Sequence, residues 1–355
     1  MKRWIIILLP PLPGEGWGGG VRWLLRRCVA VVRVPPSPPH VQPRDAAALW
    51  PVQARAGGLG AAGRSPGRGR SKTLVLLAFV LYLTQAHALQ VTDDRGVTVT
   101  FAQTPQRIVS MLPSLTEGVC AMDQCQRLVG VDRYSNFPDS LKALPKLGGG
   151  MDPNIEAIVA LKPDVVLVSG KSRASERLEA LGIKVVALET KTHADVKRVL
   201  SVLGVLLAVP EAQGAERLWR IIDSSVSAAA QSLPAKARTA RVYFEVSRGP
   251  YAAGEASFIG ETLTRLGVKN VVPAKLGPFP RLNPEFVVRA NPDVIMIGNR
   301  SMVNAVAYPG WNSIKAVKNN RVCVFGVGDS DVVVRPGPRM AEAARLMAKC
   351  LESYE

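Results

Sequence analysis

Few residues of this sequence have the type and spacing that catalysis needs. A nucleophilic hydrolase site generally needs a histidine base, and only His193 follows the export signal predicted below. His193 lies at the expected start of a helix, where capping or exposure to solvent is the usual role. The glycines at 148–150 do not form a GxGxxG pattern and do not follow a predicted strand, which disfavours a dinucleotide site. An α/β enzyme is therefore only a distant alternative.

Four cysteines follow the same signal: Cys120, Cys125, Cys323 and Cys350. An even number of cysteines in an exported protein indicates one or two disulfides. Cys120 and Cys125 are the favoured pair because they would close a short loop after a predicted helix. The pairing of Cys323 and Cys350 stays open. The spacing and the single histidine do not fit a zinc motif, so we expect neither a metal nor a cofactor.

Two glutamates open a repeated pattern that organises the chain. EAIVALKPDVVLV runs from Glu156 to Val168, and EFVVRANPDVIMI runs from Glu285 to Ile297, 129 positions later. Asp152-Pro153 and Asn283-Pro284 predict an N-cap followed by a first-turn proline. The later Pro-Asp pairs predict the helix ends, and the apolar runs that follow suit strands buried on both faces of a parallel sheet. Two copies of one helix-turn-strand unit predict two similar lobes.

Strand and helix signals alternate on either side of a helical middle segment. This alternation predicts an α/β fold with two Rossmann-like lobes, residues 89–210 and 235–355, each built on a parallel sheet. Residues 211–234 carry apolar side chains at helical spacing and predict a long, rigid linker helix. Because a continuous helix resists bending, we do not expect the lobes to open widely.

The N-terminal region differs in composition. Residues 1–72 are rich in Pro, Gly and Arg without a sustained helical or strand period, so we expect a non-native or disordered leader and a start of translation later than Met1, for example at Leu59. The apolar stretch from Thr73, with the small-x-small site at 86–88, predicts a signal peptide over 73–88 that is cleaved near Ala88 and exports the protein to the periplasm.

The positive charge also concentrates at the N-terminus. Of the formal net charge of +17, residues 1–88 contribute +10 and the remainder +7. That remainder has no Lys/Arg run and no interleaving of basic and aromatic residues, so we expect a solvated basic surface and no binding of nucleic acid.

From Arg107 to Leu351 the sequence resembles the periplasmic substrate-binding proteins of ABC importers for cobalamin, haem and iron-siderophores, the class III proteins with a rigid helix between two lobes. The matching segments are RIVSMLPSLTE, LVGVDRYSNFP, GGGMDPNIEAIVALKPDVVL, GPFPRLNPEFVVRANPDVI and PGWNSIKAVKNNRVCVF. Tyr134-Ser135, Phe279-Pro280, and Asp331 four residues before Arg335 look most like the cobalamin-binding members. The resemblance implies a monomer that is not an enzyme, carries a small-molecule ligand and delivers it to an ABC permease dimer in the inner membrane.

The resemblance also implies roles for single residues. Glu156 and Glu285 would lie on the outer tops of the lobes and dock on arginines of the two permease subunits; the alternative is that each only complements its helix dipole. The residues implied to contact the ligand are Ser114, Tyr134, Gly149, Gly150, Tyr251, Phe279, Asp331 and Arg335.

A cobalamin-type corrinoid is the ligand expected from this set. Aromatic rings suit its broad, flat faces, and Asp331 and Arg335 could bond its amide side chains or an axial group. Core packing for the aromatic residues and a surface ion pair for Asp331 and Arg335 are the alternatives. One departure concerns the glycines at 148–150, which stand where cobalamin binders have a Trp before the first repeat. A smaller corrinoid, haem or an iron-siderophore therefore remains an alternative ligand.

Overall fold

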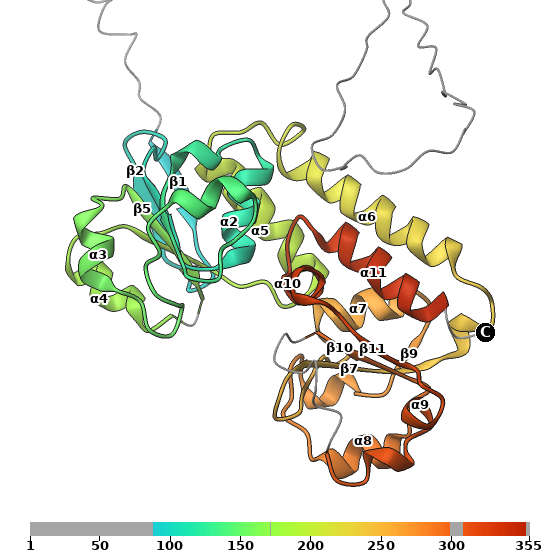
Figure 1. Ribbon diagram of the computed structural model, residues 1–355. Coiled ribbons are helices and arrows are strands. Elements are labelled where there is room, and N and C mark those ends of the chain that lie inside the picture. Colours follow the sequence, from blue (N-terminus) through green and yellow to red (C-terminus); the bar gives the residue numbers. More distant parts are fainter. Residues whose placement is uncertain (1–87, 171, 299–307, 353–355) are drawn as a thin grey trace, which may run out of the picture. The chain divides into compact units, whose positions relative to one another are not determined.

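The computed structural model describes residues 88–170, 172–298 and 308–352. The expected leader (1–72) and all but the last residue of the expected signal peptide (73–88) lie outside these residues. The described chain forms two α/β lobes, each built on a largely parallel sheet (Figure 1), which confirms the predicted fold class.

The N-terminal lobe has a four-stranded parallel sheet in the order β4-β3-β5-β6. Its strands are β3 (Ile108–Ser110), β4 (Leu128–Val131), β5 (Val165–Ser169) and β6 (Val185–Leu188). Its helices are α2 (Pro113–Ala121), α3 (Ile155–Ala160), α4 (Ala174–Ala180) and α5 (His193–Leu206). An N-terminal hairpin is formed by β1 (Leu89–Thr92), which pairs antiparallel with β2 (Thr98–Phe101).

The C-terminal lobe repeats this arrangement. Strands β9 (Lys269–Asn270), β7 (Arg241–Ser247), β10 (Val294–Ile297) and β11 (Val322–Val324) are parallel, and their order matches that of β4-β3-β5-β6. The short β8 (Tyr251–Ala252) pairs antiparallel with the end of β7. The helices are α7 (Phe258–Arg265), α8 (Pro284–Ala290), α9 (Lys315–Lys318), α10 (Val327–Val334) and α11 (Met340–Glu352).

The repeated unit forms α3 with β5 in one lobe and α8 with β10 in the other. The residue before each proline, Lys162 or Asn291, has a positive φ of 46° or 45°, which ends the helix. The aspartate after each proline then accepts backbone N–H groups that lead into the neighbouring strand: Asp164 from Arg107 at 2.8 Å, and Asp293 from Arg241 at 3.0 Å. The Pro-Asp pair therefore both ends the helix and joins adjacent strands.

One of the two predicted N-caps is wrong. Asn283 caps α8 as predicted and accepts the N–H of Glu285 at 3.0 Å. In the other copy the cap is Asn154, which accepts the N–H of Ala157, and not Asp152. The chain is still extended at Pro153, which forms a β-bridge with Gly148, so that helix begins two residues later than the proline suggested.

The linker helix α6 spans Ala215–Ser232 and is shorter than the predicted 211–234. Residues 211–214 form turns instead, because the chain reverses direction after α5. Its eighteen residues extend about 27 Å at 1.5 Å per residue. Helix α6 lies alongside α11 (Figure 1) and also contacts α5 and α7, so helices from both lobes pack on it.

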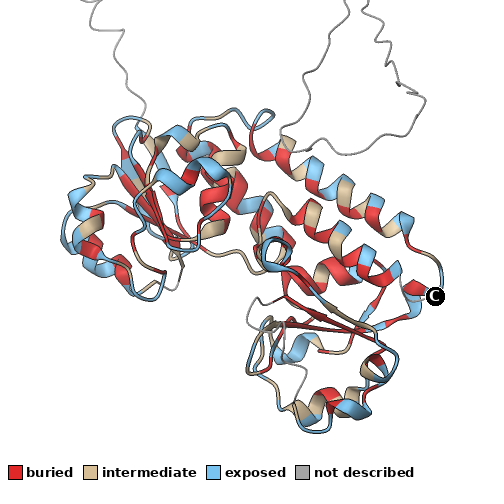
Figure 2. Ribbon diagram, in the orientation of Figure 1, coloured by how far each residue is buried: buried red, intermediate tan, exposed pale blue. Residues whose placement is uncertain are grey.

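The apolar core is shared between the lobes. Alternate residues of β5 point to opposite faces of the sheet, with Val165 and Leu167 in one cluster and Val166 and Val168 in another. The first cluster continues through α5, α6 and α11 into the C-terminal lobe, where it includes Val242 and Phe244 of β7. Figure 2 shows the central strands of both sheets, β3, β5, β7 and β10, as largely buried. Opening the lobes widely would expose part of this common core to water.

Two disulfides join cysteines within the lobes. Cys120 pairs with Cys125 across a Cα–Cα distance of 4.3 Å, and Cys323 of β11 pairs with Cys350 of α11 across 6.1 Å. Among the residues that the structure describes, no helix has the length and apolar character needed to cross a bilayer.

Candidate ligand-binding site

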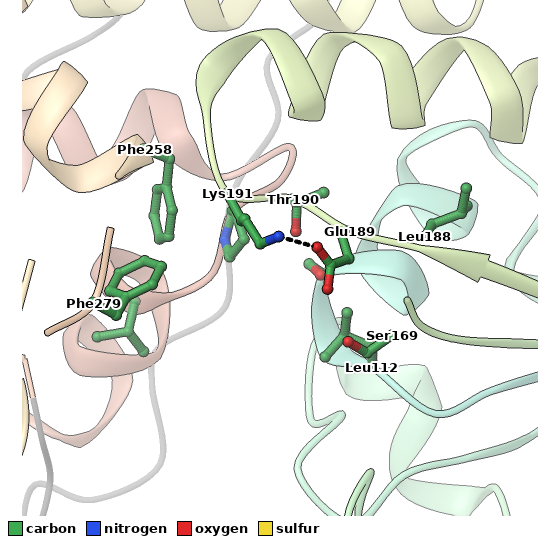
Figure 3. A pocket seen from close by; sticks show the side chains of 11 residues that line it. Leu112, Ser169, Leu188, Glu189, Thr190, Lys191, Phe258 and Phe279 are labelled. Carbon is green, nitrogen blue, oxygen red and sulfur yellow. Dashed lines mark ion pairs between the residues drawn. The ribbon is translucent and has the colours of Figure 1, made fainter. Parts of the chain in front are cut away.

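A pocket of about 280 Å³ lies between the two lobes. On the N-terminal lobe it is bounded by residues at or just beyond the carboxyl ends of β3, β5 and β6, including Leu112, Ser169 and Leu188. Ligands of open parallel α/β sheets bind at this edge, because the loops that leave the strands there diverge and leave a crevice. Opposite lie Phe258 and Phe279 of the C-terminal lobe (Figure 3).

Six of the eleven residues that line the pocket are apolar and five are polar or charged. Phe258 and Phe279 contact each other with ring centroids 6.0 Å apart and planes tilted by 58°. Phe279 is 37% exposed, so part of its ring is free to contact a ligand. Across the pocket Lys191 forms an ion pair with Glu189 (Figure 3), which leaves little net charge on that wall.

Two of the predicted ligand residues, Ser114 and Phe279, line this pocket. Ser114 belongs to the first turn of α2 and is buried. Tyr134, Gly149, Gly150, Tyr251, Asp331 and Arg335 are not among the described residues that line it.

Tyr134 and the glycine stretch lie together on the N-terminal lobe, in loops that follow β4. Tyr134 is 60% exposed, and a Cβ built on Gly149 would be 3.4 Å from its ring. A Cβ on Gly150 would be 3.6 Å from the carbonyl oxygen of Met111, just beyond β3. Gly148 has a φ of +87°, and a Cβ there would be 2.4 Å from the Asp152 carbonyl oxygen, so this turn requires glycine.

A buried polar network holds the loop of Tyr134. Asp132 accepts the N–H of Tyr134 at 2.9 Å and the hydroxyl of Ser135. Thr116 of α2 connects Ser135 (2.9 Å) to Ser110 of β3 (2.8 Å). Burial raises the pKa of the Asp132 carboxyl, although the bonds from Ser135 and Tyr134 act in the opposite direction. The exposed ring is thus carried on a rigid backbone.

Tyr251 lies on the C-terminal lobe beside the segment that carries Phe279. Residues 250–254 run antiparallel to 278–282, with Tyr251 opposite Arg281. The preceding loop is anchored by Tyr308, whose hydroxyl accepts the N–H of Gly249 and donates to the carboxylate of Glu245, both at 3.0 Å.

Glu245 is a buried carboxyl near the carboxyl end of β7. Tyr243 donates a second hydrogen bond to it at 3.3 Å. Burial raises its pKa to about 7, although both tyrosine hydroxyls and the charge of Arg248 favour the ionised form.

Arg335 and Asp331 form part of a bridge between the lobes. Arg335 is buried and donates to Glu117 of α2 and to Asn136, both at 2.9 Å, and it forms an ion pair with Asp331 at 3.0 Å. Arg339 donates to the same Glu117 carboxylate at 2.7 and 2.9 Å. The guanidinium of Arg335 is therefore bound mainly by protein groups and not directed at the pocket.

Sequence reasoning missed the partners of this bridge. Glu117 is 3% exposed, and its partners follow it by more than two hundred positions. No local pattern in the sequence links Glu117 to Arg335 and Arg339. His193 was expected to start a helix and either to cap it or to be exposed to solvent. It does start α5, but its ring is buried, and its Nε2 is within hydrogen-bond distance of the Phe258 carbonyl (3.0 Å) and the Thr262 hydroxyl (2.9 Å) of α7.

The two repeated glutamates are exposed at equivalent positions. The side chain of Glu156, in the first turn of α3, is 80% exposed, and that of Glu285, in the first turn of α8, is 74% exposed. Each carboxylate has an arginine partner at a long ion-pair distance. Arg177 lies 3.4 Å from Glu156, and Arg289 lies 3.6 Å from Glu285. Exposed pairs of this kind are weak, so both carboxylates are available to a partner.

No group of three or more His, Cys, Asp or Glu side chains that could hold a metal ion is present in the described part of the chain.

The sequence is similar to those of known proteins of one family. A family model described as periplasmic binding protein matches residues 108–326. The chain is 30% identical over 283 residues to an uncharacterized ABC transporter substrate-binding lipoprotein, YvrC, of Bacillus subtilis (strain 168), covering 76% of this chain and 87% of that protein. It is 28% identical over 247 residues to a vitamin B12-binding protein of Pectobacterium atrosepticum, covering 68% and 86%.

A solved structure gives the same result. That of a possible iron-binding (periplasmic solute-binding) protein from Staphylococcus epidermidis aligns with a TM-score of 0.59 at 26% identity, covering 70% of this chain and 99% of that one. The family consists of substrate-binding proteins of transporters and not of enzymes, in agreement with the prediction from sequence. The family match covers most of both lobes and nine of the eleven residues that line the pocket, and the chain belongs to the periplasmic binding protein family.

Proposed function

We propose that this protein is the solute-binding component of an ABC importer and that it captures a cobalamin-type corrinoid between its lobes. The observation that carries the proposal is the pocket at the carboxyl ends of β3, β5 and β6, closed on its other side by Phe258 and Phe279. The vitamin B12-binding relative supports the choice of ligand.

The exposed aromatic residues fit a large, flat ligand. Tyr134 and Phe279, in loops of the two lobes, and Tyr251, in the short β8, present partly exposed rings. Such rings contribute broad apolar contact with little loss of side-chain entropy. A corrin ring is much larger than a pocket of about 280 Å³, so it would fill this pocket with one edge and rest on the loops around it.

The protein must also be exported and must deliver its ligand to the membrane. The signal peptide directs the chain to the periplasm, with cleavage near Ala88, and N-terminal sequencing of the exported protein tests this step. There the monomer delivers the corrinoid to a permease dimer in the inner membrane, with Glu156 and Glu285 as the docking residues.

The ligand is tested by titrating the exported protein with cyanocobalamin, haem and a ferric hydroxamate siderophore, using calorimetry and visible absorption. We expect saturable binding of cyanocobalamin at one site and weaker binding of the other two. Tight binding of haem or of the siderophore without binding of the corrinoid would replace the proposed ligand by that alternative.

A substitution in the pocket links the ligand to this site. Phe279→Ala removes a ring that lines the pocket, and we expect a loss of corrinoid affinity of about tenfold, in the range that truncation of an aromatic contact causes. Leu276→Ala is the matched control, since Leu276 is 40% exposed against 37% for Phe279 but does not line the pocket. Equal affinities of the two variants would argue against this pocket as the site.

A further inference from the structure

We infer that His193 is a positioning residue for ligand binding: its ring holds the start of α7, and with it the ring of Phe258, against the N-terminal lobe at the pocket. This inference rests on the proposed function, because it assigns a role in binding the corrinoid. It goes further by naming a residue that does not line the pocket and the side chain through which it acts.

The start of α5 and the start of α7 are joined by hydrogen bonds between the lobes. The backbone N–H of Phe258, the first residue of α7, donates to the carbonyl oxygen of Lys191 at 2.6 Å. The backbone N–H of His193, the first residue of α5, donates to the carboxylate of Glu261 at 2.5 Å. Segments of two different lobes are therefore fixed to each other at this point.

The ring of His193 adds a side-chain contact to the same joint. His193 is 8% exposed, and its Nε2 lies 3.0 Å from the carbonyl oxygen of Phe258 and 2.9 Å from the hydroxyl of Thr262. Because a carbonyl oxygen only accepts, the bond to Phe258 requires the proton on Nε2. The hydroxyl of Thr262 also donates to that carbonyl oxygen, at 2.7 Å. The Phe258 carbonyl is therefore held by two side-chain donors.

The imidazole of His193 is held in its neutral form. Burial lowers the pKa of the ring, and the charge of Arg265 acts in the same direction, whereas the charges of Glu261 and Asp223 oppose it. The ring also contacts Trp219 of α6, with ring centroids 6.2 Å apart and planes at 78°. Contacts with both α6 and α7 thus fix the orientation of the ring.

The joint lies next to two side chains of the pocket. Lys191 and Phe258 both line the pocket (Figure 3), whereas His193 and Thr262 are not among the described residues that line it. Phe258 is 4% exposed and contacts the more exposed ring of Phe279. A shift of the first turn of α7 away from Lys191 would move this aromatic pair. Since a binding site depends on neighbours that hold its contact residues in place, the ligand would then lose apolar contacts.

The test compares two neutral amide substitutions that differ in reach. The side-chain nitrogen of Gln is as many bonds from Cα as Nε2 of His, so His193→Gln keeps a donor near the position of Nε2. The nitrogen of Asn is one bond closer to Cα and corresponds to Nδ1, so His193→Asn loses the bonds to α7.

Titration of the exported variants with cyanocobalamin measures the affinity, and thermal unfolding without ligand measures the stability. We expect His193→Asn to lower the affinity about three- to tenfold, the range of one hydrogen bond. His193→Gln should keep the affinity within about twofold of wild type, because its amide replaces the donor.

A double-mutant cycle with Phe258 tests the route of the effect. Phe258→Leu removes the aromatic ring but leaves the carbonyl oxygen that His193 bonds. If His193 acts by positioning this ring, adding His193→Asn to Phe258→Leu should lower the affinity by no more than about twofold further, because both substitutions then remove the same contact. Losses that multiply would show that His193 does not act through the ring and would overturn the inference.

Asp293→Ala is the control for a loss of stability alone. Asp293 is 7% exposed and bonds the backbone N–H of Arg241 and the side chain of Lys315, just before β10. We expect its substitution to lower the melting temperature and to leave the affinity unchanged. Thr262→Val removes the second partner of Nε2 and keeps the shape of the side chain. It should lower the affinity in the same direction, and it replaces His193→Asn in the cycle if that variant does not fold.

The inference is refuted if wild type binds cyanocobalamin and the variants His193→Asn and Thr262→Val bind it equally well. It is also refuted if His193→Gln loses as much affinity as His193→Asn, or if Asp293→Ala does. In each of these cases the proposed function stands. Failure of wild type to bind the corrinoid would instead overturn the proposed function, and the inference with it.

Discussion

At the scale of single residues, the buried carboxyl of Glu245 makes the free energy of unfolding depend on pH. It lies on β7, opposite Ala252 of β8, and is bonded to two tyrosine hydroxyls. Burial raises its pKa from 4.5 to about 7, so the folded protein favours the protonated carboxyl. The resulting stabilisation is fully present below about pH 4.5 and is lost as the pH rises toward 7.

Glu245→Gln should remove this pH dependence, because an amide stays neutral at every pH. We expect the wild-type free energy of unfolding to fall, relative to that of the variant, by up to about 3 kcal/mol between pH 4.5 and 8, since one pKa unit corresponds to about 1.4 kcal/mol. Urea unfolding of both proteins at several pH values measures the difference. Parallel profiles for the two proteins would contradict it.

At the scale of elements, several predictions from sequence hold because they depend on local signals. The apolar runs after the two Pro-Asp pairs form β5 and β10, and Asn283 caps α8, as predicted. The start of α3 was misplaced because Asp152-Pro153 has the local signature of a helix start, whereas a β-bridge keeps Pro153 extended. In that case a contact with another segment overrode the local preference.

The candidate site was less predictable than the fold. Phe279 and Ser114 line the pocket, but the buried partners of Arg335 could not be read from the sequence, since Glu117 lies 218 positions away. An ion pair between distant segments leaves no periodic signal. The resemblance implied a ligand contact for Arg335, with an ion pair to Asp331 as the alternative, and the structure has that ion pair together with a bond to Glu117 of α2.

This bridge should contribute strongly to stability. Glu117→Ala would leave the buried Arg335 with Asp331 as its remaining carboxylate partner and would remove the carboxylate that the half-buried Arg339 bonds. Removing one partner of a buried ion pair costs about 3 to 5 kcal/mol. Urea unfolding at neutral pH measures the loss. Glu216→Ala is the control, because Glu216 forms only an exposed pair with Arg220 on α6, which is worth about 0.5 kcal/mol. Similar losses in the two variants would show that the bridge has no special role.

At the scale of the whole molecule, the shared core and the repeated glutamates bear on how the protein meets its transporter. One apolar cluster runs through both lobes, which favours a body that changes little in shape when it binds ligand. Two glutamates at matching positions of two similar lobes suit a partner with two similar subunits. A rigid body would keep the spacing between them constant, so a permease dimer could recognise both at once.

Charge reversal separates docking from ligand binding. We expect Glu156→Arg and Glu285→Arg together to weaken stimulation of the permease ATPase about tenfold or more, because like charges placed opposite each other at an interface cost several kcal/mol. Corrinoid affinity should stay unchanged, since neither residue lines the pocket. The assay uses the cognate permease in liposomes with liganded protein, and Glu216→Arg on α6 is the control for charge reversal at another exposed site. A loss of corrinoid affinity in the double variant, or full stimulation by it, would leave the glutamates with only the local role of complementing their helix dipoles.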